Sequence, residues 1–338
     1  MPESLAPGPF FAVGVWRSGT SLLYALLNQH PQIALLYEGD LPLLGPFFRA
    51  PGGRAQWPDR WEFWNGALHR HQLDKATFPP DLDEEISATR ATYRQFASRK
   101  GARIWGDKSP TYYVELLRLA RAFPDARFLI IWRGPEGILS SIQRAAEKSH
   151  WFRKRGMSLR ALLGCREMKR QCDELRRRGF PVHEIHYEEM VRDPEPVMRS
   201  ICDYLGIGFD PAMLSLASAD RSAIADGEHH SMVRSERVVA DGQKADALSP
   251  AMRAKARRYV NLWRRETGAE WPRFPQSAEA GAGQPGAVER VFDRVLYRFY
   301  RAFDHQVLLL YSVAPIAMLQ RYRDWKRREP RGRASAGD

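Results

Sequence analysis

Residues 10–23 read FFAVGVWRSGTSLL, and this stretch decides the fold of the 338-residue chain. An apolar run predicts a buried strand, a short polar turn follows it, and an apolar helix comes next. Gly14 and Gly19 have the spacing of a Walker A loop, but Thr20 stands where that motif has its lysine. A cation is present inside the loop, at Arg17. We therefore expect a loop that aims backbone N–H groups at an anion, but not at the β- and γ-phosphates of a nucleoside triphosphate.

Composition narrows the class of protein. The net charge is +12 and 44% of the residues are hydrophobic, which suits a sizeable core and an anionic ligand, nucleic acid or an anionic membrane as partner. A basic, solvated surface explains the charge equally well. The three cysteines have neither the spacing of a metal site nor the even number of a disulfide set, and residues 1–9 lack the pattern of a secretory signal. Both observations favour a cytoplasmic location.

Strand and helix patterns alternate along most of the chain. The predicted strands are 10–15, 32–36, 103–106, 127–132 and 182–187. The predicted helices are 21–29, 83–100, 111–122, 135–146, 159–178, 195–205 and 249–267. This alternation predicts an α/β fold, a P-loop-like three-layer sandwich with a central, mostly parallel sheet flanked by helices. Ligands of such sheets bind at the carboxyl ends of the strands.

The chain divides into four parts by composition. We expect an α/β domain at 8–274, a flexible linker at 275–287, a C-terminal amphipathic helical element at 288–328 and a disordered tail at 329–338. Residues 307–319 are the most apolar stretch and have arginines on both sides, but they are too few to span a bilayer as a helix. They fit an anchor on an anionic membrane surface, or a helix that packs on the domain or on a second copy.

A second candidate anion site follows the strand at 127–132. Arg133 ends this strand, and Ser141 lies about two turns into the next helix. Together with the lysine-less loop, this pair predicts a site for a second phosphate group.

These motifs resemble the sulfotransferases that use 3′-phosphoadenosine 5′-phosphosulfate (PAPS), nearest to the bacterial and tyrosylprotein branches. Matching blocks lie at 14–22, 106–110, 133–141 and, more loosely, 186–194. The resemblance covers about residues 10–208 and does not extend to the C-terminal element. It implies PAPS as co-substrate and a reaction that works without a metal.

The resemblance also implies the residues of the nucleotide site. Those expected to hold the 5′-phosphate and the sulfuryl group are Arg17, Ser18, Gly19, Thr20 and Ser21. Arg133 and Ser141 are expected at the 3′-phosphate, and Tyr187 lines the nucleotide site. A basic loop covers the nucleotide in the family, and its candidates here are Arg234, Arg237 and Lys244. Arg144 lies one residue out of register with a further arginine of the tyrosylprotein enzymes.

Transfer of a sulfuryl group needs a base for the proton of the acceptor and cations for the leaving phosphate. Glu38 is the expected base, because it stands where the tyrosylprotein branch has its catalytic glutamate. Arg17 and Lys108 are expected to stabilise the leaving group. Asp40 is a second candidate for the base, and the histidines that could replace it are His69, His71 and His150. In the alternative interpretation Lys108 is a plain loop cation that pairs with Asp107.

Two other functions remain open from the sequence. One is a nucleoside or small-molecule kinase with a degenerate P-loop, and the other is a non-enzymatic protein that binds an anion or nucleic acid. For a sulfotransferase, the acceptor hydroxyl or amine is undetermined, and the basic, apolar tail favours a carbohydrate or glycolipid. We expect a nucleotide and an acceptor as partners rather than nucleic acid. The tail leaves open a membrane association at the inner face, and a homo-oligomer.

Overall fold

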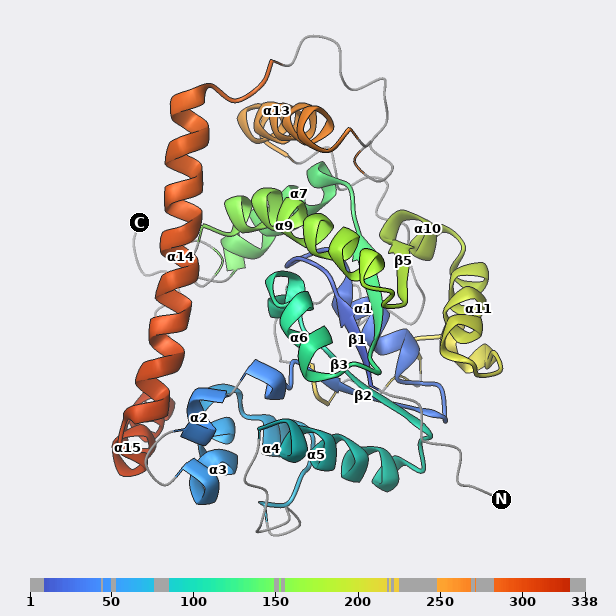
Figure 1. Ribbon diagram of the computed structural model, residues 1–338, viewed down its shortest axis with the longest axis vertical. Helices are drawn as coiled ribbons and strands as arrows, with labels where there is room; N and C mark the ends of the chain where they lie inside the picture. The colour runs from blue at the N-terminus through green and yellow to red at the C-terminus, as the bar shows by residue number, and fades with distance from the viewer. Residues whose placement is uncertain are drawn as a thin grey trace, which may run out of the picture.

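A computed structural model gives the fold of this chain. It describes residues 9–43, 45–49, 53–75, 85–148, 152, 156–217, 219, 222–224, 248–268, 271 and 283–328. At its centre lies a sheet whose strands are β1 (Phe10–Val13), β2 (Ile33–Tyr37), β3 (Ile104–Lys108), β4 (Arg127–Trp132) and β5 (Val182–His186). The strand order is β2-β3-β1-β4-β5, and every neighbouring pair is parallel (Figure 1).

Helices cover both faces of this sheet. One face carries α1 (Thr20–Leu27), α10 (Tyr187–Arg192) and α11 (Pro194–Leu205). The other carries α6 (Leu116–Ala122), α7 (Pro135–Lys148), α9 (Met157–Arg177) and α13 (Pro250–Thr267). Beside β2, this second face is covered by α2 (Gly45–Arg49), α3 (Gly53–Asn65), α4 (Ala67–Arg70) and α5 (Glu85–Lys100). The predicted α/β fold with a central parallel sheet between two helical layers is confirmed.

The strands are apolar because both of their faces are buried. All the residues of β1 and β2 are buried, as expected for parallel strands covered on both sides. The cysteines at 165, 172 and 202 are free and buried in the same packing. All the strands run the same way, so their carboxyl ends meet at one edge of the sheet, where the motif residues gather.

Three local predictions were wrong. The helix expected at 111–122 is a 3₁₀ turn, Pro110–Val114, followed by α6, and the Ser109 hydroxyl caps that turn by accepting from the Thr111 N–H. β3 continues to Lys108, because this residue pairs with Tyr37 of β2. The expected strand end at Tyr187 is instead the first residue of α10.

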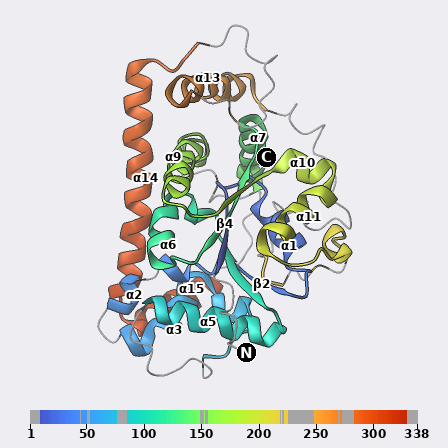
Figure 2. The same ribbon diagram turned by 45° about the vertical axis from the view of Figure 1, so that its right-hand side comes forward.

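The C-terminal part forms two helices, α14 (Ala287–Val313) and α15 (Ile316–Arg328). Figures 1 and 2 show α14 as a long rod along one edge of the molecule, with α15 at its end. Among the described residues no single helix is long and apolar enough to cross a membrane. Ala287–Val313 and Ile316–Tyr322 meet that test only as a pair, bent by 117°. The division into four parts stays a prediction, since residues 275–282 and 329–338 lie outside the described ranges.

Candidate active site

The loop after β1 has the shape of an anion cradle. Arg17 and Gly19 have φ angles of 69° and 103°, and α1 begins directly after them at Thr20. A Cβ at Gly19 would lie 2.3 Å from the ring of Tyr187, so only glycine fits here. The Ser18 hydroxyl is buried and has no hydrogen-bond partner among the described residues. An orphaned hydroxyl beside a helix N-terminus fits a site that an anion completes.

Two arginines from different strand ends meet at this loop. Arg17 Nε donates to Ser141 Oγ at 2.9 Å, and Arg133 Nη1 donates to the Arg17 carbonyl, also at 2.9 Å. The Arg133 guanidinium lies 4.0 Å from the ring centre of Tyr187. The structure therefore brings together the predicted loop, Arg133, Ser141 and Tyr187, although they come from three separate parts of the chain.

Positive charge is concentrated in this part of the edge. Burial, together with the nearby charges of Arg133 and Arg144, lowers the pKa of Arg17 to about 10. Arg144 donates to the Ser140 hydroxyl at 2.7 Å, which keeps it in the same group. We call Arg17, Arg133 and Arg144 the cationic corner. Like charges held together in a partly dry site attract an anion strongly.

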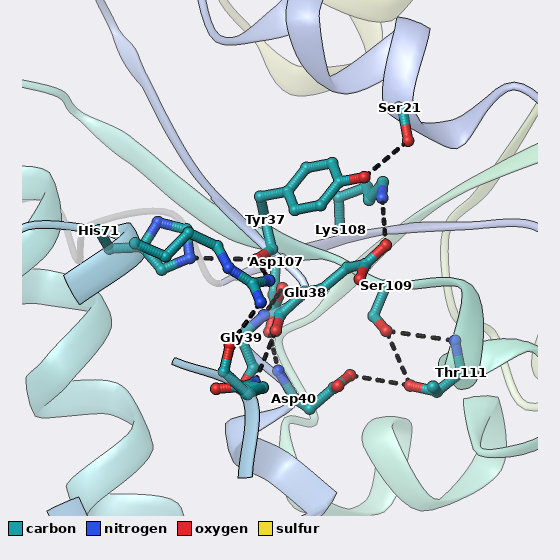
Figure 3. Close-up of polar contacts among 12 residues, drawn as sticks. Ser21, Tyr37, Glu38, Gly39, Asp40, His71, Asp107, Lys108, Ser109 and Thr111 are labelled. Atoms are coloured by element: carbon teal, nitrogen blue, oxygen red, sulfur yellow. Dashed lines mark hydrogen bonds and ion pairs between the residues drawn. The ribbon is translucent and has the colours of Figure 1, made fainter. Parts of the chain in front are cut away.

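Glu38 and Lys108 lie across the edge from this corner, at the ends of β2 and β3. Lys108 Nζ donates to Glu38 Oε1 at 2.9 Å and lies 3.6 Å from the ring centre of Tyr37 (Figure 3). The Tyr37 hydroxyl in turn bonds Ser21 Oγ at 2.8 Å, on α1. Burial disfavours the charged form of Lys108, but attraction to Glu38 and Tyr37 outweighs it and raises the pKa of the ammonium. Lys108 is therefore a charged, fully buried group held at the edge of the sheet where the carboxyl ends of the strands meet.

Asp107 holds the backbone of the turn that carries Glu38. Its carboxylate accepts from the N–H groups of Gly39 and Asp40, both at 3.0 Å (Figure 3). The hydroxyls of Tyr93 and Tyr112 also donate to it, each at 2.6 Å. Burial, together with the charge of Asp40, raises the pKa of Asp107 to about 7.

The alternative pairing of Lys108 with Asp107 is wrong. Successive side chains of a strand point to opposite faces of the sheet, so these two neighbours on β3 diverge. The Lys108 ammonium contacts Glu38, whereas the Asp107 carboxylate contacts the backbone of the turn that follows Glu38. We call Glu38, Asp40 and Asp107 the acidic corner.

The other candidates for the base are held in different ways. Asp40 is buried and accepts from the Thr111 hydroxyl at 2.8 Å, and burial raises its pKa. His71 is buried, with its Nε2 3.1 Å from the Tyr37 carbonyl, whereas His69 is exposed on α4. His150 and the loop candidates Arg234, Arg237 and Lys244 lie outside the described residues.

A pocket of about 690 Å³ opens beside the edge. Trp16 of the loop and Thr111, the partner of Asp40, line one part of it, and Arg298, Arg301 and Leu308 of α14 line another. Its walls combine aromatic and apolar side chains with several cations. Within the described residues no cluster of histidine, cysteine or acidic side chains could hold a metal ion.

Sequence reasoning missed the role of Asp107 and the link through Tyr37. Asp107 lies in the block at 106–110. Because successive side chains of a strand alternate between faces, its side chain could have been predicted to point away from that of Lys108. Its two tyrosine partners come from α5 and the 3₁₀ turn, and no local pattern points to them.

The sequence of this chain is similar to those of known proteins. A model of the sulfotransferase family matches residues 9–211, which is more than half of the chain. The nodulation protein NoeE of Sinorhizobium fredii is 32% identical over 164 residues, covering 45% of this chain and 34% of that protein. Protein-tyrosine sulfotransferase 1 of Danio rerio is 27% identical over 215 residues, covering 60% of this chain and 54% of that protein. The matches thus span only about a third to a half of these relatives.

A solved structure has the same fold. The sulfotransferase domain from the olefin synthase of Synechococcus PCC 7002 superposes with a TM-score of 0.54 at 22% identity. The likeness covers 80% of this chain and 98% of that domain. At this level of identity the match supports the fold and leaves the chemistry to be argued from the residues.

Proposed function

We propose that this chain, which belongs to the sulfotransferase family, transfers a sulfuryl group from PAPS to a hydroxyl or amine of an acceptor. One observation carries the proposal. At the carboxyl edge of the sheet, Arg17 of the lysine-less loop donates to Ser141, and Arg133 at the end of β4 donates to the Arg17 carbonyl. Two linked cationic groups suit a ligand with two separate phosphates, which PAPS has.

Each part of the nucleotide has a matching group of residues. Residues 17–21 and the N-terminus of α1 would hold the 5′-phosphosulfate, and the orphaned Ser18 hydroxyl would gain a partner there. Arg133 and Ser141 would hold the 3′-phosphate. Tyr187, which packs against both Gly19 and Arg133, would line the space between the two anionic groups.

The reaction then needs one proton transfer. The acceptor oxygen or nitrogen attacks sulfur while the bond from sulfur to the 5′-phosphate oxygen breaks, and adenosine 3′,5′-bisphosphate leaves. Glu38 takes the proton of the acceptor. Its ion pair with Lys108 weakens as the carboxylate is neutralised, which leaves the buried ammonium to stabilise the departing phosphate together with Arg17.

The acceptor would bind in the pocket that lies between Trp16 and α14. Thr111 on its wall donates to Asp40, so this wall of the pocket adjoins the acidic corner. Aromatic and cationic walls suit a carbohydrate or a glycolipid that carries negative charge.

Binding of two nucleotides tests the proposal. Adenosine 3′,5′-bisphosphate should raise the melting temperature more than ATP with magnesium does, since a ligand at about 100 times its Kd stabilises by about 2.7 kcal/mol. A larger rise with ATP and magnesium would favour the kinase, which the missing Walker lysine argues against. No rise with either nucleotide would leave the non-enzymatic alternative.

A further inference from the structure

α14 presents an apolar face to solvent along its whole length. Large hydrophobic side chains recur every three or four residues, the interval that keeps them on one side of a helix. This outer stripe consists of Val288, Val291, Phe292, Val295, Phe299, Phe303, Leu310 and Val313. Their exposed fractions run from 49% at Phe303 to 84% at Val288. Exposed Gln306 fills the gap before Leu310, so no charged residue interrupts the stripe within α14.

The inner face of α14 combines ion pairs with aromatic and apolar contacts, because Tyr297 is buried in the core and Leu308 and Tyr311 pack on the domain beside α3. Acidic residues of this face pair with basic residues of α9 and α13. The pairs are Glu289 with Arg258, Asp293 with Lys255 and Asp304 with Arg160. Near the end of the helix, Arg60 Nη1 donates to the carbonyls of Tyr311 and Ala314 at 2.8 and 2.9 Å. An amphipathic helix at the surface of a globular domain normally buries its apolar stripe, whereas the outer stripe of α14 faces solvent.

Positive charge accompanies the stripe. Arg294 and Arg298 are exposed and lie on the same side of it, because four residues separate them. α15 also exposes large hydrophobic side chains, at intervals of four and three residues: Met318, Tyr322 and Trp325. Its sequence, IAMLQRYRDWKRR, contains one acidic residue among many basic ones. Aromatic side chains beside basic residues are typical of helices at a membrane interface.

We infer that α14 and α15 dock this protein on an anionic lipid surface, with the outer stripe of α14 in the boundary between headgroups and acyl chains. α14 lies along an edge of the molecule (Figures 1 and 2), and its outer stripe is exposed there, where a flat surface can approach it. The neighbouring arginines and the net charge of +12 complement anionic headgroups.

A second copy of the chain fits this face less well. The seam of a coiled coil is a narrow stripe with a repeat of about 3.5 residues, whereas this one is broad, with side chains such as Val291 and Phe292 adjacent in sequence. A parallel pairing would also place Arg294 and Arg298 near their own copies. The inference does not depend on the proposed function, because the outer stripe takes no part in the candidate active site.

Sedimentation with lipid vesicles tests the inference. The full chain should sediment with vesicles of two parts phosphatidylcholine to one part phosphatidylglycerol, and less with phosphatidylcholine alone. The double variant Phe292→Glu and Phe299→Glu should bind the mixed vesicles at least roughly tenfold more weakly, because two carboxylates then enter the apolar boundary. A matched control is Ile86→Glu with Ser98→Glu, which adds the same charge at exposed positions of α5.

The outcomes separate the two occupants. Loss of binding in the stripe variant but not in the control, with both melting like the original chain, supports the inference. Equal binding by all three proteins overturns it. The inference is also overturned if the original chain binds neither kind of vesicle. If light scattering shows a dimer that the stripe variant dissociates, the face belongs to a second copy.

Discussion

The two corners of the sheet edge differ in how their charges are satisfied. In the acidic corner, backbone N–H groups and two tyrosine hydroxyls saturate Asp107, and Lys108 pairs with Glu38. In the cationic corner, Arg17, Arg133 and Arg144 are close enough to lower the pKa of Arg17. The first corner is fixed by its own contacts, whereas the second gains most from a ligand. Changes in the acidic corner should therefore affect geometry and stability, and changes in the cationic corner should affect binding.

The largest effect is expected at Glu38, where the acidic corner meets the chemistry. Glu38→Gln keeps an oxygen for Lys108 but cannot take a proton, so turnover should fall about 10²–10⁴-fold with little change in nucleotide affinity. Turnover is measured as the transfer of labelled sulfuryl groups from PAPS to acceptors of a fractionated cell extract. Nucleotide affinity is measured by calorimetry. Turnover close to that of the original chain would move the base to Asp40 or His71.

A smaller effect is expected at Arg133. Arg133→Ala removes charge-assisted hydrogen bonds to phosphate, which contribute about 1.5–3 kcal/mol each, so the Kd for adenosine 3′,5′-bisphosphate should rise roughly 100-fold. Titration calorimetry measures this, with exposed Arg121→Ala as a control for the loss of charge. An unchanged Kd for Arg133→Ala would remove this residue from the nucleotide site.

The smallest effect concerns stability at Asp107. Asp107→Asn leaves donors of the turn without a full acceptor, which should lower the free energy of unfolding by about 1–3 kcal/mol. Its pKa of about 7 lies above the ordinary value, so its proton stabilises the folded chain at low pH, and this contribution is lost as the pH rises through 7. The melting temperature of the original chain should therefore fall more steeply between about pH 4 and 7 than that of the variant. Parallel curves would show that Asp107 does not titrate in this range.

Much of the fold and the cationic corner could be predicted from the sequence. Glycine spacing and alternating apolar runs are local signals, and the parallel sheet brings Arg17 and Arg133 to one edge. The acidic corner could be predicted only in part, because the support of Asp107 comes from Tyr93 and Tyr112 on other elements.

The orientation of α14 could not be predicted either. The sequence shows an amphipathic helix, and such helices usually turn their apolar side inward. Here the inner face pairs with Arg160 of α9 and with Lys255 and Arg258 of α13, which lie on other elements than α14. A pattern within one segment does not report such partners.

The backbone at the edge carries a further consequence. Arg17, Glu38 and Asp40 have φ angles of 69°, 52° and 54°, a region that disfavours side chains by about 1 kcal/mol each relative to glycine. At position 38 a glycine would relieve this strain but would leave the buried Lys108 ammonium without its ion pair, so the side chain is retained at a backbone position that disfavours it. The backbone is thus strained at positions that the proposed chemistry uses, as is common at functional sites.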